Sequence, residues 1–168
     1  DLSGYQVVVQ ANMPIDALTL KATAAMGTGD DPNTDNDVEE FIPFMDKDPH
    51  FTLVYEYFMN TAAGRKNTSF ANTTALGLGA MFQVNKMVGV GLDLWMLSAD
   101  QKDNINPAGT VADDEIGNEV DVTLALKIYD QLTWNTVFGI FMPGKMYEDA
   151  AGKADDATAI HSVMSYKF

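Results

Sequence analysis

The chain has 168 residues, of which 46% are hydrophobic, and its formal net charge of −14 comes from 24 acidic and 10 basic residues. A protein that binds nucleic acid needs a basic patch to meet the phosphates, so this charge argues against DNA or RNA as a partner. The sequence has no cysteine and no run of the ~18 apolar residues that a transmembrane helix needs, which excludes disulfides, thiol catalysis, zinc–thiolate centres and helical membrane spans.

The first elements expected are two strands joined by a tight turn. In residues 5–13 and again in 18–26, apolar residues alternate with polar ones. Side chains of a strand point to opposite faces in turn, so this period of two predicts strands with one apolar and one polar face. Pro14 and Asp16 are turn formers between them. The chain starts at Asp1 without an initiator methionine or a signal peptide, and we therefore expect a mature form or a fragment.

An acidic segment follows, and we expect residues 31–72 to form a long loop that can fold into the interior of the protein. Residues 51–60 within it also alternate, with Leu53 and Tyr55 on one parity and Val54 and Glu56 on the other. An eighth strand at 51–60 is therefore an alternative that the sequence leaves open.

Five further strands are expected in the second part of the chain. Alternation predicts them over residues 74–84, 87–97, 119–129, 132–142 and 157–168. Short polar turns follow the first and the third of these five strands, at Asn85-Lys86 and at Asp130-Gln131. The polar segments 98–118 and 143–156 are rich in Asp, Asn, Gly or Pro and are predicted to be loops.

The lengths of strands and connections together predict an antiparallel transmembrane β-barrel. Strands of 9–11 residues can cross a bilayer at a tilt. They exceed the ~5–6 residues of ordinary strands. Short turns alternate with long loops, as in outer-membrane barrels with periplasmic turns and extracellular loops. We therefore expect an all-β chain that forms one barrel domain over residues 1–168 in the bacterial outer membrane, with a long extracellular loop at about 31–72.

The number of strands decides whether such a barrel closes by itself. With seven spans every short turn lies on the periplasmic side, whereas with eight spans the first turn lies outside. Seven antiparallel strands cannot close, because the first and the last run parallel, and open edges are not tolerated in lipid. Seven strands therefore predict the C-terminal part of a larger barrel, completed by missing N-terminal strands or by another chain. Eight strands predict a small closed barrel filled by side chains.

The polar parity of the strands predicts the residues that line the interior. The candidates are Lys21, Asp93, Glu119, Asp121, Lys127, His161 and Lys167. Paired carboxylates can serve acid–base catalysis, but mixed charge is also what a water-filled lumen needs. No Ser-His-Asp order, phosphate loop or metal motif accompanies them, and the two histidines have no ligand spacing. We expect a channel and not an enzyme.

One acidic group is a weak candidate for a metal site. Asp113, Asp114 and Glu115 supply the carboxylate oxygens that calcium prefers, although the twelve-residue calcium-loop pattern is absent. We expect no cofactor beyond weak Ca²⁺ binding at such acidic loops, where the ion would bridge to lipopolysaccharide phosphates.

The last strand carries a predicted assembly signal. Met164, Tyr166 and Phe168 lie on its apolar parity, and a terminal Phe after an alternating strand resembles the closing strand that the barrel-assembly machinery recognises in outer-membrane barrels. Aromatic residues near the strand ends on the lipid parity fit the girdles of such barrels, and these are Tyr5, Trp134, Tyr166 and Phe168. Trp95 lies on the opposite parity and is expected to point into the lumen.

From residue 113 onward the chain resembles the alginate-export family of outer-membrane barrels. The resemblance is carried by D-D-E-I-G-N-E-V-D-V-T-L (113–124), L-T-W-N-T-V-F-G-I-F-M-P-G (132–144), S-Y-K-F (165–168) and, loosely, F-I-P-F (41–44). It implies a larger barrel of many strands with an N-terminal portion that is absent here. Alginate is a polyanion that calls for a basic lumen, whereas this chain has one arginine, Arg65, and mixed inward charges. Alginate is therefore not expected to be the substrate.

The expected function is that of an outer-membrane porin for the passive diffusion of small hydrophilic solutes, with a mild preference for cations. Its surroundings would be outer-membrane lipid and lipopolysaccharide. A structural or scaffolding barrel that presents its loops to an envelope partner is the alternative. A soluble barrel of the lipocalin type would instead need a polar outer face and an apolar interior.

Overall fold

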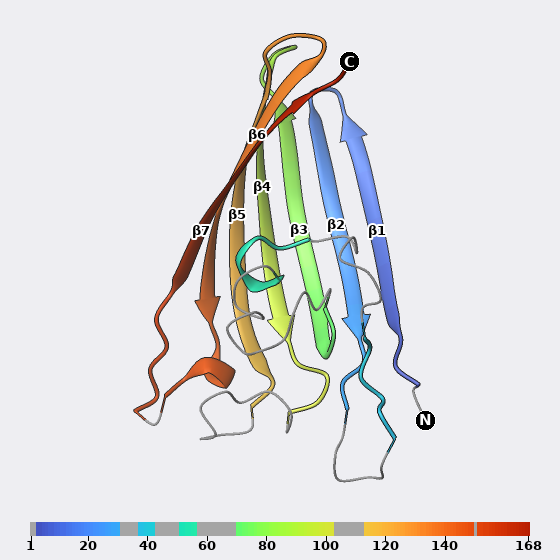
Figure 1. Cartoon of the computed structure of the whole chain (residues 1–168), viewed down its shortest axis with the longest axis vertical. Coiled ribbons are helices and arrows are strands. Elements are labelled where there is room, and N and C mark those ends of the chain that lie inside the picture. Colours follow the sequence, from blue (N-terminus) through green and yellow to red (C-terminus); the bar gives the residue numbers. More distant parts are fainter. Residues whose placement is uncertain (1–2, 31–36, 43–50, 57–69, 103–112, 150) are drawn as a thin grey trace.

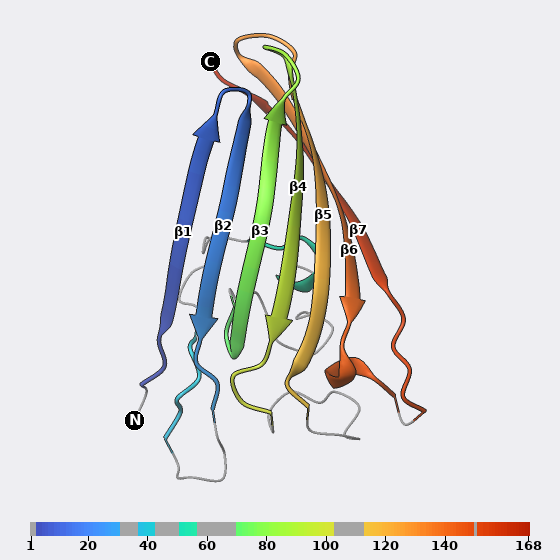
Figure 2. The same ribbon diagram turned by 180° about the vertical axis from the view of Figure 1, so that it is seen from behind.

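The protein is a single antiparallel sheet of seven strands that follow one another in sequence order, shown by the computed structural model in Figure 1 and, from behind, in Figure 2. The structure describes residues 3–30, 37–42, 51–56, 70–102, 113–149 and 151–168. The strands are β1 (Gln6–Ile15), β2 (Leu18–Gly27), β3 (Thr73–Gln83), β4 (Val88–Ser98), β5 (Glu115–Lys127), β6 (Leu132–Pro143) and β7 (Ala157–Tyr166), and a short 3-10 turn, η2 (Lys145–Tyr147), follows β6. The predicted all-β class and the seven alternating stretches are confirmed.

The three short connections lie at one end of the sheet together with the C-terminus, and the longer connections lie at the other end (Figure 1). Asp16 adopts a positive φ of 51° in the β1–β2 turn. The side-chain oxygen of Asn85 accepts the N–H groups of Met87 (2.8 Å) and Val88 (3.0 Å), which closes the β3–β4 turn. The predicted grouping of short turns at one end is therefore present.

The two faces of the sheet differ in chemistry. On one face, here called the apolar outer face, large apolar side chains from every strand are exposed: Val7, Val9, Met13, Leu20, Leu76, Leu78, Phe82, Val90, Leu92, Leu94, Met96, Val122, Leu124, Trp134, Phe138, Met142, Ile160, Met164 and Tyr166. Two of them, Leu78 and Ile160, are 63% and 69% exposed. The opposite face is concave and carries the polar and charged residues of the alternation.

The core lies on the concave face, towards the end with the long connections. Residues 51–56 lie against this face, and the sheet curves around them (Figures 1 and 2). Phe51 stacks on Phe70 at 5.3 Å between ring centroids, and Tyr55 stacks on Phe141 at 5.9 Å. The buried apolar cluster includes Val54, Tyr55, Phe70, Trp95, Ile116, Phe141 and Met146. Its hydrophobic burial fixes the turn of 51–56 to the sheet.

The alternative of an eighth strand over 51–60 is wrong for the part that the structure describes. Residues 51–56 form a short helical turn and pair with no strand of the sheet, and residues 57–60 lie outside the described residues. The alternation of Leu53, Val54 and Tyr55 does not separate an exposed from a buried face, because all three side chains are buried. The greater part of the predicted loop 31–72 likewise lies outside the described residues.

The boundary of β5 differs from the expectation. This strand begins at Glu115, four residues before the predicted start, so that the loop before it ends earlier than expected. The register with β4 shifts between Leu97 and Ser98, and Gly117 has a φ of 139°. A bulge of this kind interrupts the period of two, which hid the start of the strand in the sequence.

Among the described residues, no helix is both long and apolar enough to span a membrane.

Candidate functional site

The candidate site is the concave face where residues 51–56 meet the sheet. The register pairs Lys21 with Gly79, Gly79 with Asp93, and Asp93 with Asp121, so that these four residues form one row across β2 to β5. The next row towards the long connections contains Thr23, Gly77, Trp95, Glu119 and Phe141. Four of the predicted lumen residues are thus brought together in two neighbouring rows.

Lys21 and Asp93 form an ion pair across an intervening strand. The Nζ atom of Lys21 lies 2.6 Å and 2.9 Å from the two carboxylate oxygens of Asp93. Gly79 of β3 lies between them in the row, and a Cβ there would overlap Oδ1 of Asp93. The missing side chain of Gly79 therefore makes room for the pair, which is partly exposed on the concave face.

Glu119 holds the turn of residues 51–56 to the sheet. Its Oε1 accepts the backbone N–H groups of Leu53 and Val54, each at 2.6 Å, and its Oε2 accepts that of Tyr55 at 2.8 Å. The three N–H groups are consecutive and direct the positive ends of their dipoles at the carboxylate, as the first N–H groups of a helix do with a bound anion. The Glu119 side chain is fully buried, and the three donors satisfy its charge.

A second carboxylate, that of Glu56, belongs to the turn itself and closes it by hydrogen bonds. Oε2 of Glu56 accepts the N–H groups of Phe51 (2.6 Å) and Thr52 (2.7 Å) and lies 3.1 Å from the Thr52 hydroxyl. Burial raises the pKa of Glu56 from 4.5 to about 7. The hydrogen bonds from the N–H groups of Thr52 and Phe51 act in the opposite direction and lower this pKa in part. Glu56 is a buried acid that is half protonated near neutral pH.

Asp121 is the third carboxylate of this group. It is 4% exposed, and its Oδ1 has no hydrogen-bond partner among the described residues. It lines a cavity of about 210 Å³ together with Phe51, Leu53, Asp93, Thr123 and His161. A second cavity of about 200 Å³ shares Phe51 and Asp93 with the first, and Gln10, Asn12 and Lys21 lie in its wall.

The other predicted lumen residues lie apart from this group. Lys127 lies on the concave parity near the short-turn end and forms an ion pair of 2.7 Å with Asp130 in the following turn. His161 lines the cavity beside Asp121. Lys167 is exposed beyond the end of β7, where its backbone N–H donates to Gln131. The other histidine, His50, lies outside the described residues.

The acidic group at residues 113–115 faces lysines. Lys145 lies 4.0 Å from Asp113 and 3.5 Å from Glu115, and Lys102 lies 3.5 Å from Asp114. The N–H of Glu115 and the charge of Lys145 hold the pKa of Asp113 below its ordinary value. The described residues contain no group of three or more acidic or histidine side chains that could hold a metal ion. Weak calcium binding here stays a prediction.

The residues of the proposed assembly signal lie on the apolar outer face or beyond its edge. Met164 and Tyr166 are more than half exposed, and Phe168 extends past β7 with its ring 5.2 Å from that of Tyr166 in an edge-to-face arrangement. Trp95, in contrast, is buried on the concave face, as expected, where Gly77 leaves space for its ring.

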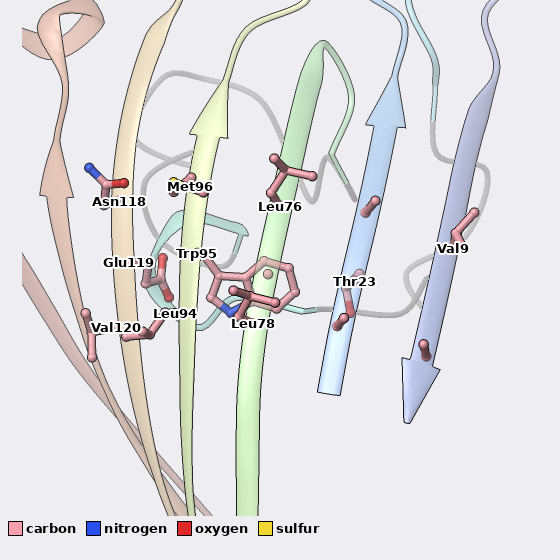
Figure 3. Close-up of a pocket in the computed structure, with 14 residues that line it drawn as sticks. Val9, Thr23, Leu76, Leu78, Leu94, Trp95, Met96, Asn118, Glu119 and Val120 are labelled. Carbon is pink, nitrogen blue, oxygen red and sulfur yellow. The ribbon is translucent and has the colours of Figure 1, made fainter. Parts of the chain in front are cut away.

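The apolar outer face is hollowed over β1 to β5. Small residues, Ala11, Ala22 and Ala24, are flanked by larger apolar ones and leave a depression of about 650 Å³. Figure 3 shows Val9, Leu76, Leu78, Leu94 and Met96 around it, while Trp95 and Glu119 belong to the other face of the same strands. Apolar side chains form most of the wall of the depression, and Asn118 adds a polar group on the same face.

Sequence reasoning did not identify Glu56 or the turn of 51–56 as parts of the site. The local signal is the spacing of Thr52 and Glu56, whose side chains hydrogen-bond to nearby backbone and so compete with strand pairing. The contact with Glu119 joins residues 64 to 66 positions apart, for which the sequence has no local signal.

A search of the sequence against known protein families and against curated proteins finds no match. The resemblance to the alginate-export family therefore stays a prediction, and the site is interpreted below from its geometry.

Proposed function

We propose that this chain forms part of the wall of a bacterial outer-membrane β-barrel that acts as a passive pore for small hydrophilic solutes. The observation that carries the proposal is the exposed apolar outer face, which runs over all seven strands opposite a polar concave face. Soluble proteins rarely expose continuous apolar patches larger than a few hundred Å². A lipid environment accounts for this face, and a soluble barrel of the lipocalin type would need the reverse arrangement.

The dimensions of the strands support the same proposal. The strands have 10 to 13 residues, and about 9–11 residues suffice for a tilted strand to cross the hydrocarbon core. In barrels of this class the short turns face the periplasm and the long loops face outward. We therefore assign the end with the short turns and Phe168 to the periplasmic side.

The directions of the two edge strands limit how the sheet can close into a barrel. β1 and β7 both run from the long-connection end to the short-turn end, so that they are parallel to each other (Figure 1). Unpaired edge groups in lipid cost several kcal/mol each. An antiparallel barrel therefore needs an odd number of additional strands between β7 and β1. A second copy of this seven-strand sheet alone would leave two parallel seams.

The mechanism that we propose is diffusion along the polar concave face, narrowed by residues 51–56. In the two central rows the carboxylates of Asp93 and Glu119 outnumber the single ammonium of Lys21. A lumen with excess negative charge raises the local concentration of cations, to an extent that salt screens. We therefore expect a mild preference for cations.

Planar-bilayer recording on the protein in its native, detergent-extracted assembly tests this proposal. We expect stepwise, ohmic conductance with a reversal potential that indicates mild cation preference in a salt gradient. An assembly that inserts into the bilayer but never conducts would refute the pore. Intact-mass measurement of the same sample will show which further strands or chains accompany residues 1–168.

A structural barrel that presents its loops to an envelope partner is the second candidate. The observation that favours it is the turn of residues 51–56, which fills part of the concave side and is held there by three hydrogen bonds to Glu119. Liposome swelling with sugars of increasing size separates the two candidates, because a filled barrel gives no swelling with any sugar.

A further inference from the structure

The second cavity of the concave face, here called the β3 cavity, lies beside the two glycines Gly77 and Gly79 of β3. Its volume is about 200 Å³, which equals roughly six or seven water molecules of about 30 Å³ each or one small ring compound. Polar side chains of β1 and β2 line it on one side of the glycines, and Asp93 and Trp95 of β4 line it on the other. Phe51 also belongs to its wall.

The charges that line the β3 cavity cancel each other. As far as the structure describes the chain, its only charged lining residues are Lys21 and Asp93, which form the ion pair described above. Their side chains stay 32% and 19% exposed. An ammonium has more N–H donors, and a carboxylate more acceptor positions, than this mutual contact uses. Because neither sign of charge is in excess, the lining suits a neutral solute with both donors and acceptors better than an ion.

Uncharged polar groups stand next to the ion pair. Gln10 and Asn12 lie on the concave parity of β1 and line the cavity with exposed amide side chains. Their register partners on β2 are Thr23 and Lys21. Nε2 of Gln10 donates to the Thr23 hydroxyl over a long distance of 3.4 Å. An amide both donates and accepts hydrogen bonds, so these side chains can bind hydroxyl groups along the β1 side of the cavity.

Phe51 gives the same cavity an apolar ring. This ring stacks on Phe70 at 5.3 Å and is only partly buried. Trp95, whose ring lies 6.1 Å from that of Phe51, adds a second aromatic group to the lining. A sugar ring has C–H groups on its faces and hydroxyls around its rim, so an aromatic side chain can pack on a face while polar groups bind the rim. An open-chain polyol has the hydroxyls but no such face.

We propose that the β3 cavity binds one neutral sugar ring. The ion pair and the two amides of β1 bind its hydroxyl groups, and Phe51 packs against one of its faces. The inference rests on the proposed pore and names a class of solute for it, whereas binding itself requires no conduction. The volume limits the site to a single ring.

Saturation-transfer NMR on the detergent-extracted native assembly tests the site, with empty micelles as the blank. The probes are methyl β-D-glucopyranoside and D-sorbitol, which both carry hydroxyls but only one of which has a ring. We expect saturable binding of the glucopyranoside, at least about threefold tighter than that of sorbitol. Asn12→Ala should weaken it by about threefold to tenfold, because a hydrogen bond to a hydroxyl is lost. The matched control is Asn135→Ala, an exposed amide on β6 that lines a different cavity and should bind like the wild type.

A second variant tests the cancelled charge. Asp93→Asn leaves Lys21 without its carboxylate. The affinity for methyl β-D-glucuronide, the anionic counterpart of the first probe, should therefore rise about threefold to tenfold relative to methyl β-D-glucopyranoside. General damage to the fold weakens the binding of both probes and cannot produce this change of preference.

Three results overturn the proposal: equal binding of glucopyranoside and sorbitol, wild-type affinity in Asn12→Ala, or an unchanged preference in Asp93→Asn. Conductance without sugar binding refutes the site and leaves the pore standing, whereas sugar binding without conductance does the reverse.

Discussion

Glu119 is the residue on which the position of the 51–56 turn depends. Replacing it by alanine leaves three backbone N–H groups without their acceptor. We expect Glu119→Ala to lower the free energy of unfolding by about 2–4 kcal/mol and to raise single-channel conductance, because the released turn narrows the lumen less. Urea unfolding in detergent and bilayer recording measure the two effects.

The matched control for this variant lies on the same strand. Glu115 is half exposed and pairs with Lys145 at 3.5 Å, a surface interaction worth at most about 1 kcal/mol. Glu115→Ala should therefore leave both stability and conductance near the wild-type values. A loss in Glu115→Ala as large as in Glu119→Ala would mean that the effect does not come from the turn.

Glu56 makes stability depend on pH. The pKa of Glu56 rises from 4.5 to about 7 in the folded protein. Between pH 4.5 and about pH 7 the folded state therefore keeps a proton that the unfolded state has lost. Stability is therefore full below pH 4.5 and falls as pH rises through about 7, by about 3 kcal/mol in all. Glu56→Gln should remove this part of the slope between pH 5 and pH 8 in urea-unfolding midpoints. Parallel slopes in the variant and the wild type would contradict the assignment.

At the scale of the elements, the strands could be predicted from the sequence and the turn of 51–56 could not. The period of two located the strands because each has one apolar and one polar face, as Val120 and Asp121 illustrate on β5. It failed at Ile116 and Gly117, where a bulge buries two consecutive residues. It also suggested a strand at 51–60, because the contact that coils the backbone comes from Glu119, far away in the chain.

The glycines of the concave face lead to a testable prediction at the scale of the elements. A Cβ on Gly77 would overlap ring atoms of Trp95, whereas the tightest contact of a Cβ on Gly89 would be with the flexible end of Gln83, at 3.3 Å. We expect Gly77→Ala to destabilise the protein by about 1–3 kcal/mol and to shift the tryptophan emission, because Trp95 must move. Gly89→Ala on β4 should change neither. Equal effects of the two substitutions would show that Trp95 does not pack on Gly77.

At the scale of the whole molecule, the apolar surface at the two edges of the sheet agrees with the proposal that an odd number of further strands completes the barrel. The apolar outer face reaches both edges, since Val9 on β1 and Ile160 on β7 are exposed like the residues of the central strands. A sheet that ended in water would gain from polar edges, as soluble sheets use charges there. On the proposed function, we therefore expect both edges to pair with further strands in the same environment.

Cysteine cross-linking tests this continuation, since the chain has no cysteine of its own. If the seven strands closed on themselves, β1 would lie beside β7, and a cysteine replacing Met13 could reach one replacing Ile160, Ser162 or Met164. We expect none of these three pairs to form a disulfide within one chain of the native assembly. The pair Met13→Cys with Leu20→Cys should form one, because these residues are direct partners on β1 and β2 and neighbouring strands are close enough for a disulfide. Peptide mass spectrometry of the oxidised protein identifies each link, and a β1–β7 disulfide within one chain would show that no further strands lie between the two edges.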